Sequence, residues 1–115
     1  MSPVDPRTLL PLAHLQFYVL LALGEGAAHG WAIIQRIRVI TTGQTSPSSG
    51  SLYLAMTRLH ENGLIEETDT RDDEDARRRY YRLTRLGRAV ARAESARLAS
   101  LVQHAQEWNL LEDRK

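Results

Sequence analysis

The spacing of hydrophobic residues divides the chain into helical segments. From Leu9 to Leu23, apolar residues recur at three- and four-residue steps with further leucines between them, which predicts a helix buried on most sides. Gly24 and Gly26 would end this helix. A second helix is predicted over about 29–41, and Pro47 favours an extended connection after it.

The third predicted helix covers about 48–62 and has one apolar and one mixed face. Ser48 or Ser49 can cap its start, because a serine oxygen accepts a hydrogen bond from a free backbone N–H group. The apolar face, expected to meet the core, carries Leu52, Met56 and Leu59. The opposite face carries Gly50, Tyr53, Leu54, Thr57, Arg58 and Glu61. Asn62 and Gly63 tolerate a left-handed backbone and would close the helix.

Two strands joined by a polar turn are predicted directly after this helix. The strands cover Leu64 to Arg71 and Arg78 to Thr84, and the turn is Asp72 to Arg77. Alternation along the second strand gives one face with Arg79, Tyr81 and Leu83 and another with Arg78, Tyr80 and Arg82. Because Leu83 is apolar, the first set is expected to face partly inward, which leaves the arginines of the second set outward.

A long final helix is predicted from about Arg85 to Leu110, with Thr84 as its cap. At about 1.5 Å per residue it would extend roughly 40 Å, longer than a domain of this size needs internally. Its narrow apolar seam consists of Leu98, Leu101, Ala105 and Trp108, with Val102 alongside. Such a seam is typical of a helix that packs against a partner helix, which predicts a dimer.

Together these segments predict a mainly α fold with a small β-hairpin, namely a winged helix-turn-helix followed by a long C-terminal dimerisation helix. Residues 1–8 would form a loose arm, residues 9–84 the winged domain and residues 85–115 the dimerisation helix. The third helix is sized for a DNA major groove, and the hairpin beside it carries an arginine cluster.

Composition limits the alternatives. With 115 residues, 43% hydrophobic and 25% charged, the chain has the size and balance of one soluble domain. The absence of cysteine excludes disulfides and thiol chemistry, and the four histidines show no metal-ligand spacing, so neither a metal site nor a cofactor is expected. We find no apolar run that could span a membrane and no secretory signal, and therefore expect a soluble cytoplasmic protein.

Charge is unevenly distributed although its sum is only +1. Eight acidic residues and a single arginine lie between Glu61 and Asp75, whereas eight arginines and a single acid, Glu94, lie between Ala76 and Ser100. The second block predicts an electrostatic surface for a polyanion such as DNA. The alternative for this block is an ordinary solvated helix face.

Three segments carry a resemblance to a known family. They are LLALGEGAAHGWAIIQRI (Leu20 to Ile37), SSGSLYLAMTRLHENGLIEE (Ser48 to Glu67) and RRRYYRLTRLG (Arg77 to Gly87). In this order and spacing the chain resembles the PadR family of bacterial transcriptional regulators, over about residues 12–105. The resemblance implies a winged helix-turn-helix, a C-terminal helix that helps to form a homodimer, and binding to a palindromic operator in double-stranded DNA, usually as a repressor. The short tail is similar to that of the compact branch with one final helix.

Two positions depart from the family pattern. Leu54 stands where the family often has proline, and Trp31 stands where it usually has tyrosine after the His-Gly pair. Trp31 keeps an aromatic ring but presents an indole N–H in place of a hydroxyl. Both departures bear on operator preference and not on the fold.

Eight residues are candidates for DNA contacts. Hydroxyl groups near the start of the third helix can meet phosphates, and residues one turn further along can reach bases, where an arginine recognises guanine O6 and N7. The adjacent wing arginines can meet phosphates or enter the minor groove. The candidates are Ser49, Ser51, Tyr53, Thr57, Arg58, Arg77, Arg78 and Arg79. Tyr53 matches a family position, whereas for Arg58 the alternative is a surface ion pair with Glu61.

The acidic turn Asp72 to Asp75 opposes this interpretation of the wing, since carboxylates at its tip would repel phosphate. We expect the turn to point away from DNA or to hold the arginines when DNA is absent. His29 can cap the second helix or contact a phosphate, and the structural role is favoured.

A small aromatic effector is a further hypothesis, because some relatives bind flat aromatic compounds in the dimer interior. Its site would lie near Leu101, Ala105 and Trp108. The favoured alternative is that Trp108 anchors a dry dimer seam.

Three classes of function compete. A dimeric DNA-binding regulator agrees with the arginine block, the helix and the hairpin. A winged-helix module that binds a protein instead of DNA would have no need for so many arginines. An enzyme is not indicated, because the sequence has no glycine-rich phosphate loop and no nucleophile–base pair at a recognisable spacing.

Overall fold

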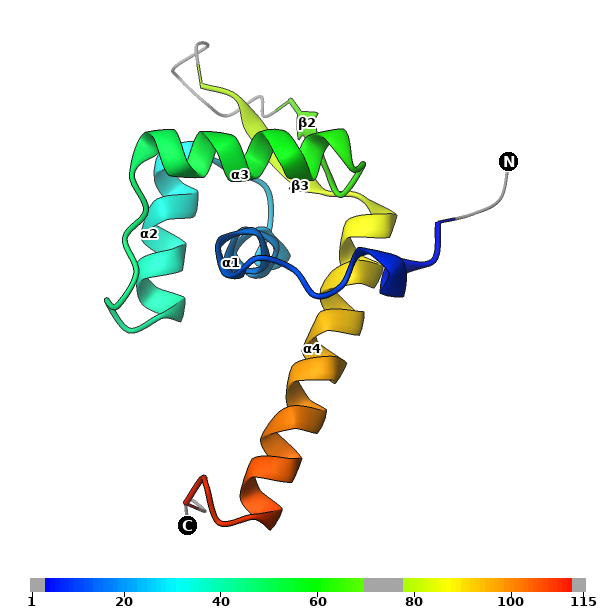
Figure 1. The fold of residues 1–115 in the computed structure, drawn as a ribbon. Coiled ribbons are helices and arrows are strands. Elements are labelled where there is room, and N and C mark those ends of the chain that lie inside the picture. The colour runs from blue at the N-terminus through cyan, green and yellow to red at the C-terminus, as the bar shows by residue number, and fades with distance from the viewer. Residues whose placement is uncertain (1–3, 70–77, 113–115) are drawn as a thin grey trace.

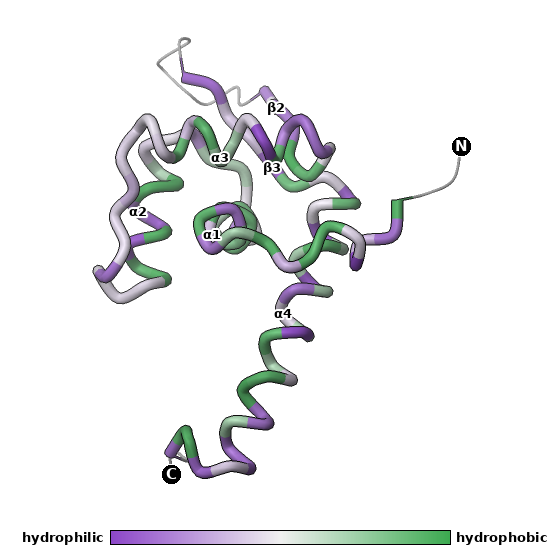
Figure 2. Tube along the Cα trace, in the orientation of Figure 1, coloured by the Kyte–Doolittle hydropathy of each residue, from purple (hydrophilic) through white to green (hydrophobic). Residues whose placement is uncertain are grey.

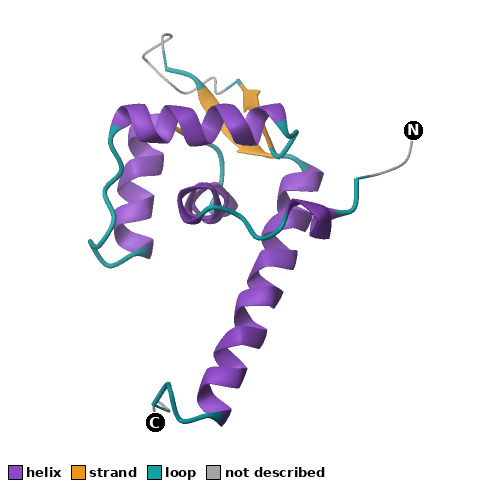
Figure 3. Ribbon diagram, in the orientation of Figure 1, coloured by secondary structure: helices purple, strands orange, loops and turns teal. Residues whose placement is uncertain are grey.

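The computed structural model describes residues 4–69 and 78–112. In chain order these residues form a 3-10 helix η1 (Pro6–Leu9), α1 (His14–Gly24), β1 (Ala28–His29), α2 (Gly30–Ile40), α3 (Ser49–Glu61), β2 (Ile65–Thr68), β3 (Tyr80–Leu83) and α4 (Arg85–Glu107). Helices form most of the molecule, and the strands lie together beside α3 (Figure 1 and Figure 3). The mainly α fold with a small β-hairpin is therefore as predicted.

The sheet is antiparallel and has the strand order β1-β3-β2. Ile65 pairs with Leu83 and Glu67 with Tyr81 in the hairpin, while Ala28 pairs with Tyr81 on the other side of β3. β1 is not predicted from the sequence, because a strand of two residues has no alternating pattern to detect. Both hairpin strands are shorter than predicted, since neither Leu64 nor Asp69 belongs to β2 and neither Arg79 nor Thr84 belongs to β3. The predicted turn, Asp72 to Arg77, lies outside the described residues.

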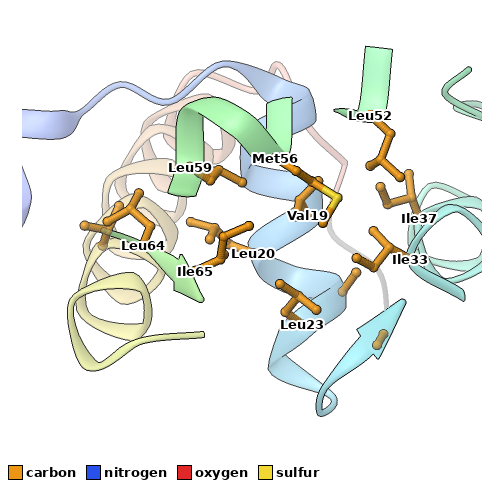
Figure 4. Close-up of a cluster of buried hydrophobic side chains, with 13 residues drawn as sticks. Val19, Leu20, Leu23, Ile33, Ile37, Leu52, Met56, Leu59, Leu64 and Ile65 are labelled. Carbon is orange, nitrogen blue, oxygen red and sulfur yellow. The ribbon is translucent and has the colours of Figure 1, made fainter. Parts of the chain in front are cut away.

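The core is built around α1. This helix is apolar on most sides and packs against α2, α3, α4 and β3, so it lies in the middle of the molecule (Figure 1). Figure 4 shows its side chains meeting those of the neighbouring elements; the labelled residues are Val19, Leu20, Leu23, Ile33, Ile37, Leu52, Met56, Leu59, Leu64 and Ile65. Each such burial contributes roughly 1.5–3 kcal/mol, so α1 fixes the positions of α2 and α3.

The first helix begins later than the sequence predicts. The apolar pattern predicts a start at Leu9, whereas α1 starts at His14 and is preceded by the separate 3-10 helix. Pro11 explains the difference, because proline disfavours helical geometry in the residue before it and Leu10 is extended. The 3-10 helix also occupies the end of the segment for which a loose arm was expected, and Asp5 caps it.

The final helix begins at the predicted residue and ends three residues before the predicted one. The Thr84 hydroxyl accepts a hydrogen bond from the Gly87 N–H at 2.9 Å, as the capping signal predicts. At the other end Asn109 has a left-handed backbone with φ of 59°, and the Leu110 N–H donates to the Ala105 carbonyl at 2.8 Å. This arrangement closes a helix, which is why α4 stops at Glu107.

The second half of α4 extends away from the other elements (Figure 1). Apolar positions alternate with polar ones along it (Figure 2). In the predicted seam Leu101 is 53% exposed, Val102 46% and Trp108 75%, while Leu98 and Ala105 are half-buried. These apolar side chains therefore lie outside the core of the single chain.

Candidate nucleic-acid interface

The start of α3 is held by serine side chains. The Ser48 hydroxyl accepts a hydrogen bond from the Ser51 N–H at 3.1 Å, and the two hydroxyl oxygens lie 3.0 Å apart. Ser48 is therefore the cap, one of the two residues predicted for this role. Ser49 and Ser51 are exposed beside it, on the same first turn. Hydroxyl groups and N–H groups of a helix N-terminus, where the helix dipole is positive, suit a phosphate.

The outer face of α3 presents large side chains to solvent. Tyr53 is 74% exposed and Leu54 is 55% exposed. Arg58 is also exposed, and no ion pair with Glu61 occurs in the part of the chain that the structure describes. Thr57 is less available, because it is partly buried and its hydroxyl donates to the Tyr53 carbonyl at 2.9 Å. Ser49, Tyr53 and Thr57 thus follow one side of the helix and line the same groove, whereas Ser51 and Arg58 lie on another side of the helix and do not line it.

A groove of about 720 Å³ separates this face from the hairpin. Its walls come from the start of α2, from α3 and from the hairpin, where Arg78 and Arg79 precede β3 and Glu67 lies in β2. Trp31, Tyr53, Met56, Glu67, Arg78 and Arg79 are among its lining residues. Aromatic rings, an apolar floor and two guanidinium groups therefore face the same hollow.

His29 connects the start of α2 with the hairpin. Its Nδ1 accepts a hydrogen bond from the Ala32 N–H at 3.3 Å, so the structural role favoured from the sequence is present. The other ring nitrogen, Nε2, is directed to the hairpin. This Nε2 lies 3.3 Å from Nη1 of Arg78, and the ring also stacks near Trp31 and meets Tyr80 edge-on. The His29 ring therefore links the start of α2 to Arg78 at the groove.

The arginines around β3 make ion pairs with the glutamates of β2. Arg79 Nη1 lies 3.4 Å from Glu67 Oε1, and Arg82 Nε lies 2.9 Å from Glu66 Oε1. The expectation that Arg79 faces partly inward is wrong, because its side chain is 77% exposed. The physical reason is that β3 begins only at Tyr80, so Arg79 precedes the paired residues that pack on the core.

Arg77 and the acidic turn Asp72 to Asp75 lie outside the described residues. Within the ranges that are described, no group of three histidine or acidic side chains could hold a metal ion. No described helix is long and apolar enough to span a membrane.

Several groove residues are not among the predicted site residues, and three of them carry polar groups or an aromatic ring that the argument uses: His29, Trp31 and Glu67. From the sequence, His29 has a mainly structural role, Trp31 is a departure from the family pattern, and Glu67 belongs to an acidic stretch. The alternation of β2 contains the signal for Glu67, since its pairing with Tyr81 places it on the face of Arg79. Using that signal requires the strand register, which the sequence does not state.

The fold and this surface define a winged helix-turn-helix protein, in which an exposed helix lies beside a hairpin that carries arginines. The sequence matches the Transcriptional regulator PadR-like family over residues 19–93. The chain therefore belongs to the PadR-like family, as its sequence predicts, and this is a family of transcriptional regulators and not of enzymes.

Solved structures of regulators have the same fold. A transcriptional regulator from Clostridium thermocellum is 25% identical with a TM-score of 0.69, and the match covers 93% of this chain and 96% of that one. A PadR family transcription regulator from Clostridium difficile R20291 is 18% identical with a TM-score of 0.71, and covers 84% and 98%. A PadR-like transcriptional regulator from Bacillus cereus is 18% identical with a TM-score of 0.71, and covers 85% and 93%. The predicted winged-helix fold is thus confirmed.

A curated relative is similar in sequence but much longer. It is an uncharacterized 37.1 kDa protein in transposon TN4556 of Streptomyces fradiae, 35% identical over 86 residues. The match covers 75% of this chain but 23% of that protein, so the chain spans less than a quarter of the relative's length.

Proposed function

We propose that this chain is a homodimeric, sequence-specific DNA-binding regulator that acts as a repressor in the cytoplasm. The observation that carries the proposal is the groove between the exposed face of α3 and the hairpin, which is lined by Tyr53, Arg78 and Arg79. Membership of a family of transcriptional regulators supports it.

In this proposal α3 enters the major groove of DNA. Ser49, Ser51 and Tyr53 would contact phosphates near the helix start, while Thr57 and Arg58 would lie towards the bases. The wing arginines, Arg77 included, would bind the adjacent backbone or the minor groove. Such phosphate contacts fix the position of the protein, whereas base contacts select the sequence.

The homodimer would form through the seam of α4, and a palindromic operator follows from its twofold symmetry. An aromatic effector, if one binds, would lie in the same seam near Leu101, Ala105 and Trp108. Titration of the dimer with flat aromatic compounds, read by tryptophan fluorescence in a Trp31→Phe variant, isolates the signal of Trp108 and tests this part of the proposal.

DNA binding is tested by fluorescence anisotropy with DNA from upstream of the protein's own gene, across a salt series and with random competitor DNA. We expect binding that survives the competitor and weakens steeply with salt. Arg78→Gln should weaken binding to every duplex and lower the slope of log K against log salt by about one. Arg7→Gln is the matched control, because it makes the same charge change at an exposed arginine of η1, outside the groove.

The outcome that contradicts the proposal is an absence of binding to either DNA at low salt. That result would favour the alternative function, a winged-helix module that binds a protein partner through the apolar seam of α4. Weak and equal binding to both DNAs would refute upstream autoregulation while leaving the phosphate contacts supported.

A further inference from the structure

Glu67 places a carboxylate inside the groove proposed for DNA. Its Oε1 lies 3.4 Å from Nη1 of Arg79, and both side chains line the same hollow. The two side chains are 53% and 77% exposed, so water and salt reach the pair freely. Exposed ion pairs of this kind are weak, about 0.2–1 kcal/mol, and a phosphate can replace the carboxylate.

A second arginine–glutamate ion pair lies on the same hairpin but outside the groove. Arg82 Nε lies 2.9 Å from Glu66 Oε1, with side chains that are 57% and 46% exposed. Glu66 is adjacent to Glu67 in β2, so its side chain points to the opposite face of the hairpin. Neither member of this second pair lines the groove.

The position of Glu67 matters because DNA brings negative charge into the groove. A phosphate that binds Arg79 must first displace the carboxylate, and it then remains close to that negative charge. Both effects oppose binding, and unit charges about 4 Å apart in water repel by about 1 kcal/mol. Neither effect depends on base sequence, since backbone contacts carry no sequence information.

We propose that Glu67 is a built-in competitor for DNA phosphate at Arg79, which lowers the affinity of the regulator for every duplex. Contacts to the DNA backbone then contribute less to the affinity. DNA sites that lack good base contacts to α3 stay unoccupied, and binding to the operator depends on those base contacts. This inference rests on the DNA-binding function proposed above and assigns Glu67 the role of limiting sequence-independent affinity.

The test compares Glu67→Gln with Glu66→Gln in the full chain. Each substitution removes one negative charge and one ion pair from the same strand, so the two variants have equal net charge. The probes are a random-sequence duplex and a duplex selected from a random library by the wild-type protein. Anisotropy titrations across a salt series give the affinity and its salt dependence, and thermal unfolding verifies that both variants are folded.

We expect Glu67→Gln to bind both duplexes ~3- to 10-fold more tightly at low salt. The slope of log K against log salt should become steeper by about one, because Arg79 then makes a full phosphate contact. Glu66→Gln should bind as the wild type does. A change in fold stability alone would not alter the salt slope, so this readout separates the proposed role from a structural one.

A double-mutant cycle with Arg79→Gln identifies the partner through which Glu67 acts. In the Arg79→Gln background the gain from Glu67→Gln should largely disappear, because the competed cation is absent. If the gain in affinity persists in full, Arg79 is not the partner through which Glu67 acts. If Glu66→Gln and Glu67→Gln gain affinity equally, the effect is one of net charge and the proposal is overturned.

Failure of this inference differs from failure of the proposed function. If the wild type binds DNA but Glu67→Gln has unchanged affinity and slope, only the role of Glu67 is refuted. If neither the wild type nor Glu67→Gln binds any duplex at low salt, the DNA-binding function is refuted and the role of Glu67 with it.

Discussion

At the scale of single residues, Glu94 is a buried carboxylate that joins the segment before α1 to α4. It is 1% exposed, and it accepts hydrogen bonds from the Leu12 N–H at 2.8 Å and from Nε of Arg97. The hydrogen bond from Arg97 lowers the pKa of Glu94; burial opposes this effect, and the Leu12 N–H adds to it. The charged form is therefore the one that the folded protein stabilises.

The lowered pKa of Glu94 predicts how stability depends on pH. Its contribution is fully present above the unfolded value, about 4.3 for glutamate, and is lost as pH falls through the lower pKa of the folded state. We expect Glu94→Gln to lower the free energy of unfolding at neutral pH by about 1.5–3 kcal/mol, and the difference from wild type to shrink in acid.

Urea unfolding at several pH values and at one fixed protein concentration measures this effect. Glu107→Gln is the control, because Glu107 lies on the same helix with an exposed side chain. A deficit for Glu94→Gln that stays constant down to strongly acidic pH would refute a role for the Glu94 charge.

At the scale of elements, the contact between α4 and the connection from α3 to β2 depends on a glycine. Gly87 lies in the first turn of α4, directly against the backbone of Leu64, where a Cβ atom would overlap the Leu64 carbonyl oxygen. That same carbonyl accepts a hydrogen bond from the Thr84 N–H at 3.1 Å, and the Thr84 hydroxyl donates to the Gly63 carbonyl at 2.6 Å. A backbone held in this way has little room to move.

Gly87→Ala is therefore expected to destabilise the protein although alanine favours helices. Overpacking of this kind costs about 1–3 kcal/mol, which exceeds the roughly 1 kcal/mol that alanine gains over glycine in a helix. Gly24→Ala is the control, since an added Cβ at the end of α1 would meet no atom within 4 Å. Thermal unfolding compares the two variants, and a Gly87→Ala protein as stable as wild type would contradict this account.

Local signals in the sequence predicted most of the elements. Ser48 and Thr84 cap helices as expected, because a cap depends on residues within one turn. Apolar periodicity alone does not locate the start of α1. The apolar pattern continues through Pro11, but this proline keeps Leu10 extended and so prevents a helix from starting at Leu9. The groove could be predicted only in part, because it depends on the register of β2 against β3 and on the approach of His29 to Arg78, far apart in the sequence.

At the scale of the whole molecule, the chain is extended and not compact, with extents of 52 × 41 × 24 Å. The second half of α4 accounts for this shape, because it leaves the core with apolar side chains exposed (Figure 2). A single chain gains nothing from these side chains, whereas a second copy can bury them. The proposed homodimer thus gives the length of α4 a physical reason.

Leu101→Glu is expected to separate the proposed dimer without unfolding the chain. Leu101 is 53% exposed and lies outside the buried core, so its replacement costs the single chain little. In the dimer the change removes apolar burial and places a charge in an apolar seam on both copies, which should weaken association by roughly 100-fold or more. Gln103→Glu is the control, because Gln103 is exposed on the opposite side of α4 and adds the same charge.

Sedimentation equilibrium gives the mass of each variant, and DNA titrations show what the dimer contributes to binding. A monomer can occupy only one half of a palindromic site, so Leu101→Glu should lose most of its affinity for a selected operator while keeping weak binding to random DNA. Gln103→Glu should remain a dimer and keep operator binding. If Leu101→Glu sediments with the mass of the wild-type dimer, this seam does not hold the two copies together, and another surface of the chain must form the dimer.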